Sequence, residues 1–128
     1  MVREVPPVRR VEQDDVGVVA GVEAPDSAGA AIALATDFNP GSAFCESLPL
    51  VCALAATQLK LAPAEALAAC TVNAAHVLAR ADRKGRLAPG YDADLTLLRA
   101  PDWRYLAYHL GGDVVAAIVI GGEVAAVG

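Results

Sequence analysis

The residues best suited to chemistry lie in one short loop and are Asp37, Asn39, Gly41 and Ser42. The Asp37 carboxylate could bind a metal ion or accept a proton from a metal-bound water. Asn39 offers a donor and an acceptor, and Ser42 offers a hydroxyl. Gly41 lets a ligand approach the backbone closely and tolerates unusual dihedral angles. We therefore expect the loop to hold a small polar ligand. The alternative is an ordinary Asn-Pro-Gly turn, with Asp37 simply ending the preceding element.

The element before the loop must position Asp37. Residues 30–36 form a continuous apolar run of the length and composition of a strand buried in a parallel sheet. A piece of buried helix is the alternative, but the dense turn formers of residues 37–42 favour the strand. A carboxylate at the C-terminal end of such a strand occupies the place where α/β barrels keep their active sites.

Residues 43–81 are almost uncharged and predict helices. The first begins at Ser47, which serves as its cap, with Pro49 in the first turn, and runs to about Leu59. Apolar residues cover its whole circumference, so we expect it to be buried on most sides. The second begins at Pro63 in the same way, with an acidic residue in its first turn near the positive end of the helix dipole.

A third, short helix follows Thr71, which we expect to cap it, and holds residues 73–79. The rest of the chain predicts short strands separated by glycine and proline turns, over residues 94–99, 114–120 and 123–127. Gly121-Gly122 between the last two is a two-residue hairpin signal.

The composition excludes several classes of protein. The chain has 128 residues, enough for one domain, and its 55% hydrophobic content excludes a disordered chain. The longest charge-free stretch, residues 66–79, is shorter than the ~18 residues of a membrane span. The N-terminus shows no secretory signal. A net charge of −5 with 5% aromatic residues makes nucleic acid an unlikely partner.

The remaining metal-ligating residue types give no site of their own. Cys45, Cys52 and Cys70 form no C-x-x-C pair, which favours a reducing cytoplasm and roles as small core residues. His76 and His109 match no zinc spacing with them. We expect both histidines to be structural.

Two motifs then identify a resemblance. Residues 71–75 (Thr-Val-Asn-Ala-Ala) and residues 85–95, which carry G-x-L-x-x-G-x-x-A-D-L, are similar to the C-terminal part of the metal-dependent amidohydrolase superfamily. Within it, residues 35–42 and 108–111 resemble the imidazolonepropionase family. The resemblance covers residues 28–128. It implies a metallohydrolase of the α/β class, built on a TIM (β/α)₈ barrel with a small composite β-sandwich.

The resemblance also implies roles for the loop residues. Asp37 matches a metal ligand at the end of the eighth barrel strand, and the metal is zinc or iron. Asn39 and Gly41 match positions that contact N-formimidoyl-L-glutamate, and Ser42 matches one that contacts imidazolone propionate. The implied reaction is the hydrolysis of 4-imidazolone-5-propanoate, by a metal-bound hydroxide, to N-formimidoyl-L-glutamate in histidine degradation.

The sequence departs from the family pattern in length and in metal ligands. Such barrels need ~200 to over 400 residues, and the histidine ligands that the family pairs with this Asp have no match here. One carboxylate cannot replace the three protein ligands of a catalytic zinc. We therefore expect a C-terminal fragment that is inactive and retains no metal when alone, completed by a missing N-terminal half or a second copy in a homodimer.

The expected organisation has three parts. Residues 1–27 are a poorly matched N-terminal segment, residues 28–81 hold the last barrel strand and helices, and residues 82–128 hold the C-terminal strands of the small sandwich. We expect the runs 95–98 and 114–120 to pair with N-terminal strands.

Two other functions remain open. A different amidohydrolase, such as a deaminase or a dipeptidase-like enzyme, would share both motifs. A non-catalytic assembly module would use the nearly uncharged residues 43–81 to dimerise.

Overall fold

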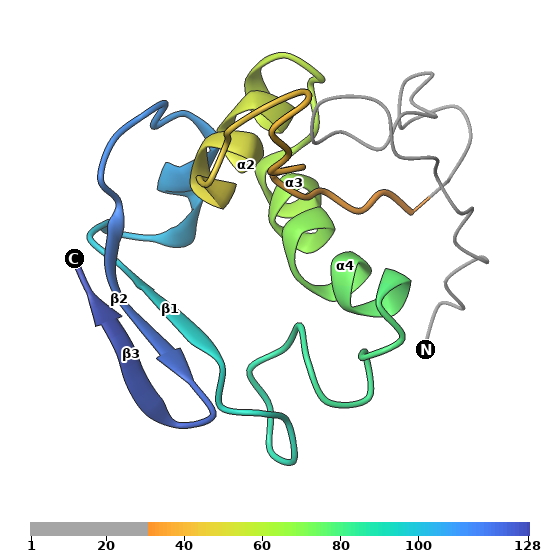
Figure 1. Ribbon diagram of the computed structural model, residues 1–128, viewed down its shortest axis with the longest axis vertical. Coiled ribbons are helices and arrows are strands. Elements are labelled where there is room, and N and C mark those ends of the chain that lie inside the picture. Colours follow the sequence, from red (N-terminus) through yellow and green to blue (C-terminus); the bar gives the residue numbers. More distant parts are fainter. Residues whose placement is uncertain (1–30) are drawn as a thin grey trace.

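A computed structural model describes residues 31–128, in which helices lie to one side of a small sheet (Figure 1). The expectations for residues 1–27 fall outside the described residues. The elements in chain order are α2 (Leu48–Thr57), α3 (Pro63–Cys70), α4 (Val72–Val77), β1 (Leu95–Leu98), the 3₁₀ helix η1 (Trp103–Ala107), β2 (Val115–Ile120) and β3 (Glu123–Val127).

The starts of α2 and α3 confirm the predicted helix boundaries. The Ser47 hydroxyl accepts a hydrogen bond of 3.2 Å from the Leu50 amide, which satisfies one of the free donors of the first turn. At α3, the Glu65 carboxylate reaches back and accepts a bond of 2.7 Å from the Ala62 amide. The expected burial of α2 on most sides is only partly correct, because Leu54 is 39% exposed.

The expected cap of α4 is correct in position but not in its side-chain bond. Thr71 stands at the N-cap position of α4, but its side chain makes no capping bond. Its hydroxyl instead donates a bond of 2.7 Å to the carbonyl of Leu67, one turn back in α3. A threonine hydroxyl can bond at either helix end, and here it bonds to a carbonyl of the last turn of α3.

The sheet is antiparallel, in the order β1-β2-β3. Gly121 and Gly122 join β2 to β3 with φ angles of 59° and 87°, as a two-residue turn with two positive φ angles requires, which confirms the hairpin. The expected pairing with N-terminal strands is wrong for β2, which lies between β1 and β3, and stays a prediction for the outer edge of β1. β1 and β2 pair with each other, with Leu95 opposite Val119, because the connection through η1 turns the chain back beside β1.

The expected strand over residues 30–36 is not formed in the described residues. Of residues 31–36, coloured orange in Figure 1, only Leu34 takes part in a β-bridge and the others have no regular structure, while residue 30 lies outside the described range. A strand exists only when a neighbour pairs with it, and no described segment supplies the ladder of bonds. The segment is instead attached to α3, where the Leu34 amide donates a bond of 3.0 Å to the Ala69 carbonyl.

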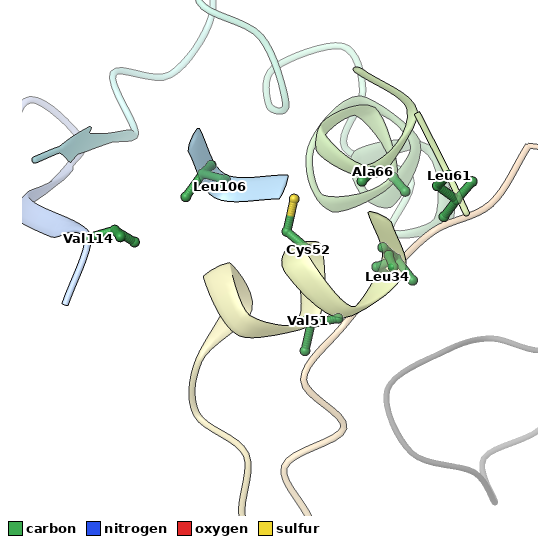
Figure 2. Packing of buried hydrophobic residues seen from close by; sticks show 9 residues of the cluster. Leu34, Val51, Cys52, Leu61, Ala66, Leu106 and Val114 are labelled. Atoms are coloured by element: carbon green, nitrogen blue, oxygen red, sulfur yellow. The ribbon is translucent and has the colours of Figure 1, made fainter. Parts of the chain in front are cut away.

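One apolar cluster joins this segment to the helices and to the start of β2. Figure 2 shows side chains of α2, α3 and η1 meeting around Cys52, which is 3% exposed. Cys52 is buried as expected, whereas Cys45 and Cys70 are half-buried, and all three are free thiols. Contact with Cys52, together with burial, raises the pKa of the Cys70 thiol above its ordinary value. No helix within residues 31–128 is long and apolar enough to cross a membrane.

Candidate functional site

The loop that follows residues 31–36 is a compact, internally bonded turn. Asn39 and Ala43 form an antiparallel bridge, in which the Asn39 amide donates to the Ala43 carbonyl at 2.8 Å and the Ala43 amide donates back at 3.0 Å. The Ser42 amide also donates to the Asn39 carbonyl, at 3.2 Å. The backbone groups of the turn are therefore paired with one another, which fixes its shape without a ligand.

The Asn39 side chain takes part in the turn as well. Its Oδ1 accepts a hydrogen bond of 2.7 Å from the Gly41 amide. This is the local bond by which an asparagine side chain stabilises a turn two residues on. The turn-forming role and the ligand-binding role are compatible, because the Oδ1 has a second lone pair and the Nδ2 group takes no part in this bond.

Gly41 serves the turn for a different reason from the one expected. Its φ angle lies outside the left-handed region, so the turn does not use the dihedral freedom that glycine offers. A Cβ at this position would stand 3.3 Å from the Asn39 Oδ1. The absence of a side chain therefore keeps room for the bond between the Asn39 side chain and the Gly41 amide. It also leaves the backbone of the loop open to a ligand.

The positive dihedral angle falls on Asp37 instead. Its φ angle is 48°, in the left-handed region, where a non-glycine residue costs roughly 1–2 kcal/mol. Aspartate is among the residues that tolerate this conformation. The half-buried Asp37 thus turns the chain out of residues 31–36 at the point where the polar loop begins. The strained backbone is typical both of a turn and of a functional position.

Two aromatic rings flank the loop. Phe38 and Phe44 flank the Asn39–Ala43 bridge in sequence, and their rings pack against each other with centroids 5.5 Å apart and an edge-to-face angle of 68°. Both rings are largely exposed, at 51% and 71%. The paired rings therefore present one exposed aromatic surface beside the polar turn.

The histidines do not join Asp37 in a metal centre. His76 is exposed on α4, and the His109 ring stacks on Tyr105 with centroids 4.6 Å apart. Within residues 31–128, no three His, Cys, Asp or Glu side chains come together as a ligand group. The described residues around Asp37 therefore do not fit a metal ion by themselves.

A separate hollow lies away from the loop of Asp37. It has a volume of about 440 Å³ and is open, between the start of α2 and the residues that lead into β2. Its lining includes Phe44, Glu46 and Asp113, but none of Asp37, Asn39, Gly41 and Ser42. The hollow therefore shares none of the candidate loop residues, and its wall is a mixture of polar and apolar groups.

Two residues of the motifs that suggested the resemblance have structural roles. The Asn73 side chain donates a bond of 2.9 Å to the Ile32 carbonyl, across 41 residues of sequence. Gly85 passes against α4, where a Cβ would stand 2.9 Å from the Ala75 Cβ. The sequence signalled both residues through their motifs, but it did not reveal that they support the segment ahead of Asp37.

Comparison with known proteins agrees with this arrangement. A model of the amidohydrolase family matches residues 9–125. The chain belongs to the amidohydrolase family. The match begins nearer the N-terminus than the motif resemblance, which starts at residue 28. In structure, the chain is similar to an amidohydrolase from Thermotoga maritima, with a TM-score of 0.61 and 28% identity over 78% of this chain and 24% of that one.

Curated relatives that are similar in sequence to this chain carry the name imidazolonepropionase. An imidazolonepropionase from Rubrobacter xylanophilus is 65% identical over 95 residues, which are 74% of this chain and 23% of the relative. An imidazolonepropionase from Chloroflexus aggregans is 50% identical over 105 residues, which are 82% of this chain and 25% of the relative. The chain thus spans about a quarter of the length of these relatives.

Proposed function

We propose that this chain forms part of an imidazolonepropionase, which hydrolyses 4-imidazolone-5-propanoate to N-formimidoyl-L-glutamate. The observation that carries the proposal is the 65% identity to the Rubrobacter xylanophilus imidazolonepropionase. Identity at this level over 95 residues supports a shared site as well as a shared fold. Asp37 and the bonded turn after it are the part of that site within this chain.

In this proposal the irregular residues 31–36 are the last strand of a TIM (β/α)₈ barrel. Their attachment to α3 and α4 supports it, since barrel strands are covered by helices on their outer face. The sheet of β1, β2 and β3 would belong to the small β-sandwich. Strand-pairing partners for residues 31–36 would come from outside residues 31–128, from an N-terminal half or a second copy of the chain.

The family generally uses metal ions, and we propose zinc or iron here, with Asp37 as one ligand. When bound, such an ion supplies an activated water for hydrolysis. Other ligands would come from outside residues 31–128, because the described His, Cys, Asp and Glu residues form no group of three or more with Asp37. Free thiols at all three cysteines are compatible with a reducing cytoplasm, where we place the enzyme.

The turn would bind the substrate. The Asn39 Nδ2 group and the Ser42 hydroxyl can bond to carboxylate or carbonyl oxygens, and Gly41 leaves its backbone accessible to them. The internal bonds of the turn hold these groups in place before the substrate arrives, which limits the entropy lost on binding.

A chimeric enzyme tests the proposal. The matching 95 residues of the Rubrobacter xylanophilus relative are replaced by those of this chain, and loss of imidazolone propionate is measured. We expect turnover, and Asp37→Asn should lower kcat on the order of 10³-fold or more. Asp82→Asn, which removes a carboxylate from an exposed loop, is the matched control and should leave kcat unchanged.

Each other outcome has a definite meaning. A folded chimera that ignores imidazolone propionate but hydrolyses a dipeptide or deaminates a base would assign the chain to a different amidohydrolase. An active chimera that tolerates Asp37→Asn would remove Asp37 from the chemistry.

A further inference from the structure

The segment that carries Asp37 depends on a few long-range contacts for its position. Among the described residues, no strand runs beside residues 31–36. Two polar contacts and one buried side chain attach the segment to the helices. Leu34 is 3% exposed, and its amide donates to the Ala69 carbonyl of α3 at 3.0 Å. Asn73 of α4 supplies the second polar contact, to the Ile32 carbonyl at 2.9 Å.

The contact made by Asn73 requires its particular chemistry. The half-buried Nδ2 donates to a backbone carbonyl, so the position needs an N–H donor of this length. Aspartate has the same shape but only acceptor oxygens when ionised, and it would face the Ile32 carbonyl with a negative charge. A buried carbonyl left without its donor costs about 1–3 kcal/mol.

The first turn of α4, which carries Asn73, is held by contacts on two sides. The Thr71 hydroxyl ties the start of α4 to Leu67 of α3. On the other side, Gly85 lies so close that a Cβ would stand 2.9 Å from both the Thr71 carbonyl and the Ala75 Cβ. Asn73 thus projects from a helix turn that is fixed from both directions.

Asp37 lies five residues after Ile32, between this anchor and the bonded turn of Asn39. Its backbone adopts a φ angle of 48°, a conformation that persists only when the surrounding structure holds it. We propose that Asn73 is a positioning residue for the Asp37 carboxylate, acting through the backbone of residues 32–37. This inference rests on the role proposed for Asp37 above.

Hydrogen exchange on the full 128-residue chain tests the anchor directly. Asn73→Asp should speed exchange of the Leu34 amide and its neighbours in residues 31–36 about tenfold or more, with β2 amides unchanged. His76→Ala, an exposed position on the same helix, is the control and should match the unaltered chain. Unchanged exchange in Asn73→Asp, a uniform rise across all amides, or no protection of Leu34 in the unaltered chain would each overturn the inference.

Turnover in the chimeric enzyme tests the consequence for Asp37. Asn73→Asp should lower kcat roughly 10–100-fold, the scale seen when a supporting partner of a metal ligand is removed, with KM changed less than about threefold. Asn73→Gln keeps an amide donor and should recover part of the loss. Full kcat in Asn73→Asp would overturn the positioning role, whereas an inactive unaltered chimera would reject the proposed function and leave the exchange result standing.

Discussion

Two aspartates show why a residue's role depends on its surroundings. Asp37 has a strained backbone beside a polar turn, whereas Asp94 of the A-D-L motif is bonded within the fold. The Gly121 amide donates to the Asp94 Oδ1 at 2.8 Å, and Lys84 pairs with its other oxygen. The motif aspartate therefore fixes the β2–β3 turn against the loop before β1, and has no free chemistry to perform.

The ionisation of Asp94 gives a prediction about acid stability. Bonds from Lys84 and from the Gly121 amide hold the pKa of Asp94 below its ordinary value. The folded state keeps this carboxylate ionised at pH values where the unfolded chain takes up a proton. Its contribution is therefore fully present above the unfolded pKa of about 3.9 and is lost as pH falls through the lower folded pKa.

Asp94→Asn keeps an oxygen for Gly121 but removes the charge that pairs with Lys84. We expect a lower free energy of unfolding at pH 7 and a smaller loss between pH 7 and pH 3 than in the unaltered chain, measured by urea unfolding. Asp82→Asn removes one negative charge from an exposed position that pairs with no described cation, and should keep the full acid-dependent loss. Equal losses in Asp94→Asn and the unaltered chain would contradict the prediction.

At the scale of elements, the two family motifs contact each other in the fold. The Thr-Val-Asn-Ala-Ala motif begins α4, and the first glycine of the second motif lies against that helix. Gly85 has a φ angle of 86° and no room for a side chain beside Ala75 and the Thr71 carbonyl. The two motifs are nine residues apart in sequence, and they are linked because the backbone of the second touches the helix that the first begins.

Gly85→Ala should therefore destabilise the chain by about 2–4 kcal/mol. Part of this is the strain of a left-handed alanine, and part is the displacement of Ala75 or the helix backbone. Gly90→Ala is the matched control, because Gly90 has a nearly equal φ angle of 87° with nothing within 4 Å of a Cβ. It should lose only about 1–2 kcal/mol in the same urea or thermal unfolding measurement. Equal losses would show that the close approach to α4 contributes nothing.

Features that depend on neighbouring residues could be predicted from the sequence, whereas features that depend on distant residues could not. Local signals were enough for the starts of α2 and α3 and for the Gly121-Gly122 hairpin, since each depends on neighbouring residues. A paired strand over residues 30–36 and a side-chain cap at Thr71 do not appear among the described residues, because the first depends on partners distant in sequence and the second on the preceding helix. The turn after Asp37 was visible from its residues, but its anchor at Asn73, 41 residues from Ile32, was not.

On the scale of the whole molecule, the apolar cluster around Cys52 connects the segment before the candidate site to the helices. Its buried members come from the segment before Asp37, from α2, α3 and η1, from the α2–α3 connection and from the residue before β2. Figure 2 shows Leu34 beside α2 and near Ala66 of α3. The position of the Asp37 segment and the stability of the fold therefore depend on the same packing.

Leu34→Ala should lower the free energy of unfolding by about 2–5 kcal/mol, because it removes a side chain that is 3% exposed and leaves a cavity between α2 and α3. Leu78→Ala deletes the same atoms at a position that is 70% exposed, and should change stability by less than about 0.5 kcal/mol. The Leu34 amide bonds to the Ala69 carbonyl. If the Leu34 side chain holds the segment, hydrogen exchange of this amide should speed up by more than the lower global stability alone would cause. A loss in Leu34→Ala no larger than in Leu78→Ala would mean that the segment before Asp37 is not part of the core, and that the helices fold without positioning the candidate site.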